Sequence, residues 1–102
     1  MFGKNNMKQM MKQVQQMQAN MEAEQAAISA TDYTGAAPQE SVIATFSGDR
    51  ELKDLQIKPE IIDATDPDTL SDMIIVAIND GLKKVEDDQQ KRLGQYAPNM
   101  PF

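Results

Sequence analysis

The first third of the chain holds an amphipathic segment that is too long for so small a domain. Residues 5–29 lack Gly and Pro and consist mainly of good helix formers. Their apolar positions recur at steps of three and four, then seven, at Met7, Met10, Val14, Met17, Met21 and Ile28. This heptad spacing predicts one helix of about 38 Å, whereas a compact chain of this length has a radius of gyration of about 13 Å. The helix must therefore project or pack on a second copy.

The next segment predicts a small antiparallel sheet. Val42, Ala44 and Phe46 alternate with their neighbours at the spacing of a strand, and Gly48 with Asp49 signals a turn. A second strand is expected from about 51 to 58, and a weaker first strand at 29–34. Because two strands alone are marginally stable, three strands backed by helices are expected. The residues expected to pack in the core or a dimer are Met7, Met10, Val14, Met17, Met21, Val42, Phe46, Leu55 and Ile57.

A second long helix is expected at residues 67–93. Pro59 ends the last strand, and Asp66 before Pro67 is a favourable helix start. The apolar pattern continues through Gly81, so the helix should continue too. The expected fold class is α+β in the order α-β-β-β-α. A single domain, 1–102, would contain the first helix (1–30), the sheet (31–58), a helical part (59–93) and a flexible tail (94–102).

Composition removes several classes of protein. The chain has no Cys, His or Trp, which excludes disulfide scaffolds, Cys/His zinc sites and nucleophiles paired with histidine. Asp63, Asp66 and Asp68 do not have the spacing of a calcium loop. No catalytic residue, metal or cofactor is therefore expected, and an enzyme is disfavoured. No apolar run is long enough to span a membrane and no secretory signal is visible. The absence of cysteine fits the reducing cytoplasm.

The charges are segregated along the chain. The net charge is −6, which by itself argues mildly against nucleic acid as a partner. Residues 1–21 carry three lysines and no acid, and residues 22–80 carry thirteen acids against three bases. The last block, 81–102, has four bases and three acids. A polyanion would therefore have to bind at the ends of the chain.

Each basic group has two interpretations. Lys4, Lys8 and Lys12 would form a ridge roughly 140° around the helix from the Met stripe, and the ridge is either an ordinary solvated face or a phosphate-contacting surface. Lys83 and Lys84 precede Asp87 and Asp88 by four residues, which favours pairing within the helix. For Lys91 and Arg92, near the end of that helix, the interpretation as a second phosphate-contacting patch is slightly favoured.

Several stretches of the sequence resemble one family. They are the start Met-Phe-Gly-Lys with residues 10–18, the Ile-Lys-Pro-Glu-Ile-Ile segment (57–62), residues 76–84 and the closing Met-Pro-Phe. Each is similar to the corresponding stretch of the YbaB/EbfC family of bacterial nucleoid-associated proteins. The resemblance implies a tweezers-shaped homodimer that binds double-stranded DNA in the nucleoid with little sequence specificity. It also implies effects on chromosome organisation and gene expression, and no catalytic residues.

The match to this family is incomplete. Ile43 and Lys58 stand where the family usually has lysine and aspartate, and Lys53-Asp54 replaces a basic pair. The sheet is therefore less basic than the family implies, and the helix ends would carry the DNA contacts: Lys4, Lys8, Lys12, Lys83, Lys84, Lys91 and Arg92. The alternative is a scaffold that acts with recombination or replication proteins.

Overall fold

Two long helices flank a three-stranded sheet. The structure, a computed structural model, describes residues 3–94; the backbone of Lys4 and Asn5 is described but their side chains are not. The elements are α1 (Lys4–Ser29), β1 (Asp32–Ala36), β2 (Val42–Ser47), β3 (Leu52–Ile57) and α2 (Pro67–Gly94), with short 3₁₀ turns at Pro38–Glu40 and Pro59–Ile61. The α+β class and the α-β-β-β-α order are confirmed. Most of the expected tail, residues 95–102, lies outside the described residues.

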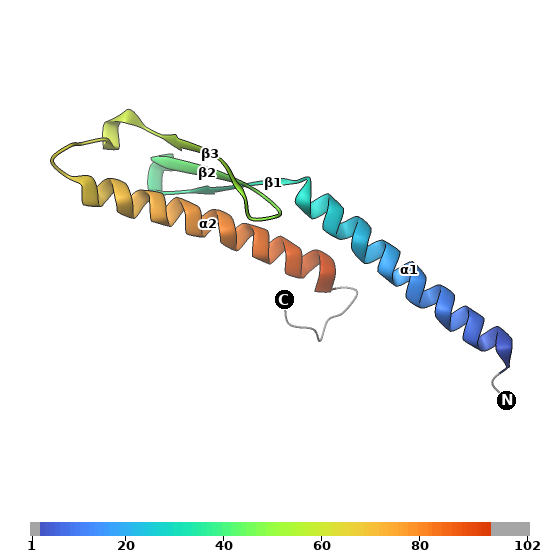
Figure 1. Cartoon of the computed structure of the whole chain (residues 1–102). Coiled ribbons are helices and arrows are strands. Elements are labelled where there is room, and N and C mark those ends of the chain that lie inside the picture. Colours follow the sequence, from blue (N-terminus) through green and yellow to red (C-terminus); the bar gives the residue numbers. More distant parts are fainter. Residues whose placement is uncertain (1–2, 95–102) are drawn as a thin grey trace.

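The body of the molecule is the sheet with α2 packed along it (Figure 1). The strands are antiparallel in the order β1-β2-β3. Alternate residues of the central strand, Val42, Ala44 and Phe46, are buried in one cluster with Ala77 and Val85 of α2. The predicted packing residues Leu55 and Ile57 lie half-buried against this cluster. One apolar face of a small sheet is thus covered by a single amphipathic helix.

Two glycines let β1 and α2 approach each other closely. A Cβ atom on Gly35 would overlap the backbone of Gly81 and Ala77. A Cβ on Gly81 would lie 2.7 Å from the Phe46 ring. The helix runs through Gly81 without a break, as the apolar pattern predicts. This glycine makes room for the Phe46 ring.

The first helix projects from the body as an arm (Figure 1). Every side chain from 6 to 20 is exposed, including Met7, Met10, Val14 and Met17, whereas Met21 is half-buried and Ile28 is buried. The molecule measures 77 × 22 × 16 Å, with a radius of gyration of 20.5 Å, well above the value of about 13 Å for a compact chain. Within one chain, the long helix projects instead of packing on its own domain.

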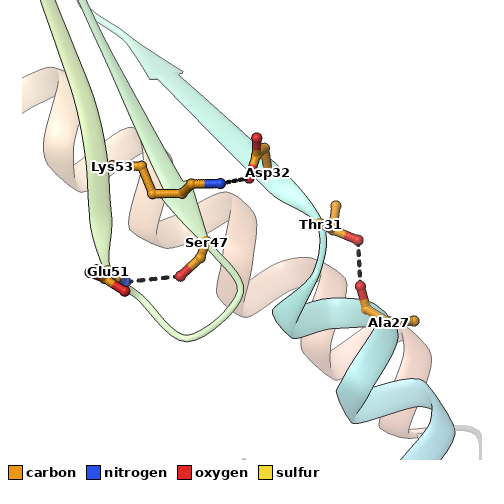
Figure 2. A network of polar contacts seen from close by, with 6 residues as sticks. All are labelled: Ala27, Thr31, Asp32, Ser47, Glu51 and Lys53. Carbon is orange, nitrogen blue, oxygen red and sulfur yellow. Dashed lines mark hydrogen bonds and ion pairs between the residues drawn. The ribbon is translucent and has the colours of Figure 1, made fainter.

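A short corner joins the arm to the sheet (Figure 2). The Ala30 N–H donates to the Ala26 carbonyl at 3.0 Å and the Thr31 hydroxyl to the Ala27 carbonyl at 2.6 Å. Strand β1 therefore begins at Asp32, three residues later than predicted, because Ser29 to Thr31 complete the helix end. Lys53 of β3 reaches across β2 to the Asp32 carboxylate at 2.8 Å.

The turn between β2 and β3 touches both helices. Asp49 accepts a hydrogen bond from the Ser29 hydroxyl at 2.7 Å, and Arg50 donates to the Gln89 side chain at 3.1 Å. The sequence predicts a turn here, but its left-handed residue is Arg50, with φ of 66°. Gly48 is needed for a different reason, since a Cβ there would overlap the carbonyl of Ile28.

The start of α2 has the expected cap. Asp66 accepts hydrogen bonds from the backbone N–H of Thr69 at 3.3 Å and from its hydroxyl at 2.6 Å. Asp63 likewise accepts two hydrogen bonds from Thr65. The acidic linker is therefore organised by local turn and cap contacts. Within residues 3–94, no helix is long and apolar enough to cross a membrane.

Candidate nucleic-acid interface

The lysines of α1 lie on the part of the arm that leaves the body. Lys8 and Lys12 are exposed and one helical turn apart, and the backbone of Lys4 extends the same row. Among the side chains that the structure describes, no carboxylate pairs with Lys8 or Lys12. The first acid of the chain is Glu22, about 15 Å along the helix from Lys12. The outer arm therefore carries only positive charge.

The basic residues of α2 divide into two kinds. Lys83 and Lys91 are exposed and make no ion pair with any residue in the range 3–94. Lys84 lies 3.3 Å from Asp80 and donates to the Thr34 carbonyl at 2.9 Å. The helix thus presents the ammonium groups of Lys83 and Lys91 to solvent, whereas the Lys84 ammonium group is engaged by Asp80 and by the Thr34 carbonyl.

Neither of the two pairs expected from spacing, Lys83–Asp87 and Lys84–Asp88, forms among the described residues. Lys84 pairs with Asp80, one turn before it, instead of Asp88. The Asp80 carboxylate is fixed there because it also accepts the Ala36 N–H of β1 at 3.0 Å, and this hydrogen bond lowers the pKa of Asp80. Asp88 is already engaged by other groups, and Lys83 forms no ion pair with Asp87 within the described residues.

Arg92 lies at a junction of three elements. Its guanidinium is 3.0 Å from Asp88 on the same helix and 3.7 Å from Glu24 on α1. Asp88 also accepts the Tyr33 hydroxyl of β1 at 2.5 Å. The hydrogen bond from Tyr33, followed by Arg92, lowers the pKa of Asp88, while burial and Asp88 raise the pKa of Tyr33. This junction, formed by Tyr33, Asp88, Arg92 and Glu24, links the arm to the body.

The arm lysines and the α2 cations do not form one patch on a single chain. Glu24, which contacts Arg92, is twelve residues from Lys12, or about 18 Å of helix. Lys12 and Lys8 lie farther out still. The two groups are therefore separate positive regions, joined by the junction.

The opposite end of the body is acidic and partly apolar. The Pro59–Ile61 turn and the start of α2 carry Glu60, Asp63, Asp66, Asp68 and Asp72 and no base. Ile62, Ile75 and Val76 are exposed at 58 %, 54 % and 43 %. This acidic end lies far from the outer arm (Figure 1), so the charge segregation of the sequence is also a segregation in space.

Comparison with known proteins identifies the family. A model of the YbaB/EbfC DNA-binding family matches residues 3–100. A nucleoid-associated protein of Lactobacillus johnsonii is 47 % identical over 97 % of this chain and 91 % of its own length. A nucleoid-associated protein of Enterococcus faecalis is 46 % identical over 99 % of this chain and 97 % of its own length. These matches confirm the resemblance found in the sequence. They also confirm the predicted function at the level of the family, whose model is that of DNA-binding proteins and whose members here are named nucleoid-associated proteins.

A solved structure agrees with this result. The chain resembles the crystal structure of an uncharacterized protein from Helicobacter pylori, with a TM-score of 0.63 and 26 % identity over 76 % of this chain and 90 % of that one. The family match spans both helices, the sheet and the basic residues at the helix ends. The chain therefore belongs to the YbaB/EbfC DNA-binding family.

Proposed function

We propose that this protein binds double-stranded DNA as a homodimer, through the cationic ends of α1 and α2 and with little dependence on base sequence. The observation that carries the proposal is the outer arm, a projecting helix whose first turns hold Lys4, Lys8 and Lys12 with no acid before Glu22. A row of ammonium groups at helical spacing is suited to contact phosphates, which supply most of the affinity in non-specific binding.

The exposed stripe of α1 supports the homodimer. Met7, Met10, Val14 and Met17 are each at least 47 % exposed. A continuous apolar stripe on a projecting helix is typical of a surface that packs on another helix. The lysine ridge points roughly 140° away from the stripe, so pairing through the stripe leaves the lysines free for DNA.

The chemistry of the cations supports weak sequence preference. Base reading in the major groove commonly uses Arg, Asn or Gln in bidentate contact with base edges. The exposed cations of the helix ends are lysines, which act as point charges on phosphates. Lys84 and Arg92 belong to the same regions, but we assign them a smaller share of the phosphate contacts because carboxylates already face them.

An anisotropy titration with two unrelated labelled duplexes of equal length tests this function. We expect the two dissociation constants to agree within a few-fold and to rise steeply between 50 and 200 mM salt, as expected for phosphate binding (about 10³-fold or more when six phosphates are neutralised). Absence of binding at low salt would refute the proposal. Such a protein would act in the cytoplasm at the nucleoid, on chromosome organisation and gene expression, and we propose no catalytic role.

One observation favours a second candidate, a protein-interaction role beside recombination or replication proteins. The acidic end combines five acids with three exposed apolar side chains, Ile62, Ile75 and Val76. Exposed apolar groups rimmed by charge are typical of protein interfaces. A stoichiometric protein partner recovered with no nucleic acid retained would favour this role over DNA binding.

A further inference from the structure

The arm has few attachments to the body, and they are all at one end. Between α1 and β1 there are only two residues, Ala30 and Thr31. Ile28 packs against Gly48, and Ser29 donates to Asp49. Side chains 6–20 are all exposed. The direction of about 30 Å of helix is thus set within its last two turns.

The space beside this attachment is open. A cleft of about 270 Å³ lies between the end of α1, the β2–β3 turn and α2, lined by polar groups that include Gln25, Asp49, Arg50 and Gln89. On this side the arm meets the turn and α2 across open space, so polar side chains act together with the packing of Ile28 to hold its angle.

Arg92 forms the contact between the arm and the body on the α2 side. Its guanidinium bridges Glu24 of the arm and Asp88 of α2, and Asp88 is anchored to β1 through the Tyr33 hydroxyl. The side chains of Arg92, Glu24 and Asp88 are 35 %, 28 % and 28 % exposed. They are therefore screened less by solvent than the Lys53–Asp32 pair, at 49 % and 55 %. Arg92 faces Asp88 with Nε at 3.0 Å and Glu24 with Nη1 at 3.7 Å, so two nitrogen atoms of one planar guanidinium serve the two carboxylates, whereas an ammonium group has a single nitrogen. The contact with Glu24 is an ion pair beyond hydrogen-bond distance.

We propose that Arg92 is a positioning residue: by holding Glu24 and Asp88 together, it sets the angle between α1 and α2 and hence the distance between the arm lysines and Lys91. This inference rests on the proposed DNA binding, because the angle matters only if both regions contact one ligand. The lever is long, since Lys8 lies sixteen residues beyond Glu24, about 24 Å. A swing of about 20° moves Lys8 by roughly 8 Å, more than twice the 3.4 Å rise of a DNA strand per phosphate.

The substitution Glu24→Gln separates positioning from simple charge. It removes one negative charge, so charge alone predicts tighter DNA binding. Positioning predicts weaker binding, by about fivefold, because the arm loses its fixed angle. The matched control is Glu22→Gln, which removes the same charge from an exposed side chain that has no ion pair among the described residues.

The angle can be measured without DNA. Because the chain has no cysteine, spin labels at Gln16→Cys and Gln90→Cys, two exposed sites, report one chosen distance. Labelled protein is diluted in an excess of unlabelled protein, so that each dimer holds one labelled chain. We expect Glu24→Gln to broaden or shift the distance distribution, Glu22→Gln to leave it unchanged, and Arg92→Lys to broaden it while the charge is kept.

An unchanged distribution in both Glu24→Gln and Arg92→Lys would overturn the positioning role, whatever the DNA result. If Glu24→Gln changed the distance distribution but bound DNA as tightly as Glu22→Gln does, the link between the helix angle and DNA binding would be overturned. If the unaltered protein bound no DNA, the proposed function would fail, and the distances would still decide whether Arg92 sets the arm.

Discussion

Gly35 of β1 and Gly81 of α2 lie so close that a Cβ atom on Gly35 would overlap the Gly81 backbone. Backbone atoms cannot move aside as the end of a flexible side chain can, so Gly35→Ala should force β1 away from α2. We expect a loss of about 3 kcal/mol in the free energy of unfolding, the upper range for overpacking, measured by urea denaturation. Gly94→Ala is the control, because nothing lies within 4 Å of the added Cβ. Equal stability of the two variants would contradict the observed crossing.

The lysine ridge predicts a specific change in salt dependence. Replacing Lys4, Lys8 and Lys12 together by Gln should weaken DNA binding and reduce the slope of log K against log salt by about 0.9 for each phosphate that is no longer neutralised. The melting temperature should change little, because the described lysines of this set are exposed and unpaired. Lys53→Gln, which removes a charge paired with Asp32 on the sheet, should leave the slope unchanged. An unaltered slope in the triple variant would place the DNA contacts elsewhere.

The exposed stripe predicts a monomeric variant. Val14 is 57 % exposed in the single chain, so Val14→Glu should not disturb the body, yet it places a charge in the centre of the helix-pairing surface. We expect the dimer to dissociate while the circular dichroism of the body persists. Gln16→Glu adds the same charge off the stripe and should stay dimeric. Retention of the dimer by Val14→Glu would move the interface away from α1.

Acid should weaken the junction on α2. The pKa of Asp88 is lowered in the folded protein by Tyr33 and Arg92, so the folded state binds the proton less readily than the unfolded chain. The stability from Asp88 is therefore complete above its unfolded value of about 3.9 and is lost as the pH falls through its lower folded value. We expect the free energy of unfolding, measured in urea from pH 7 to pH 2.5, to fall less for Asp88→Asn than for Asp87→Asn. Asp87 serves as the control because its side chain is exposed and has no partner among the described residues. Parallel curves would rule out this contribution.

Much of the fold is predictable because it depends on local periodicity and local caps. The apolar spacing predicts α1 and α2 to within a residue or two, and the Asp66-Pro67 pair predicts where α2 begins. Alternation around Val42 and Phe46 predicts β2, and Pro59 predicts the end of β3. The family follows from short stretches of sequence distributed along the chain.

The remaining features depend on contacts between distant residues. The Gly35–Gly81 crossing and the Tyr33–Asp88 hydrogen bond each join residues more than forty positions apart, and no spacing rule indicates them. The partner of Lys84 differs from the expected one because Ala36 fixes Asp80. In the sequence Glu24 only interrupts the apolar stripe, and the fold is needed to show that it faces Arg92.

The mass of the particle in solution tests the central claim most directly. Light scattering of the protein alone, and then with a short duplex at low salt, measures both assembly and ligand. We predict twice the 11.4 kDa of one chain without DNA, and that mass plus one duplex when DNA is added. A mass of one chain, or a mass that DNA does not change, would contradict a DNA-binding homodimer.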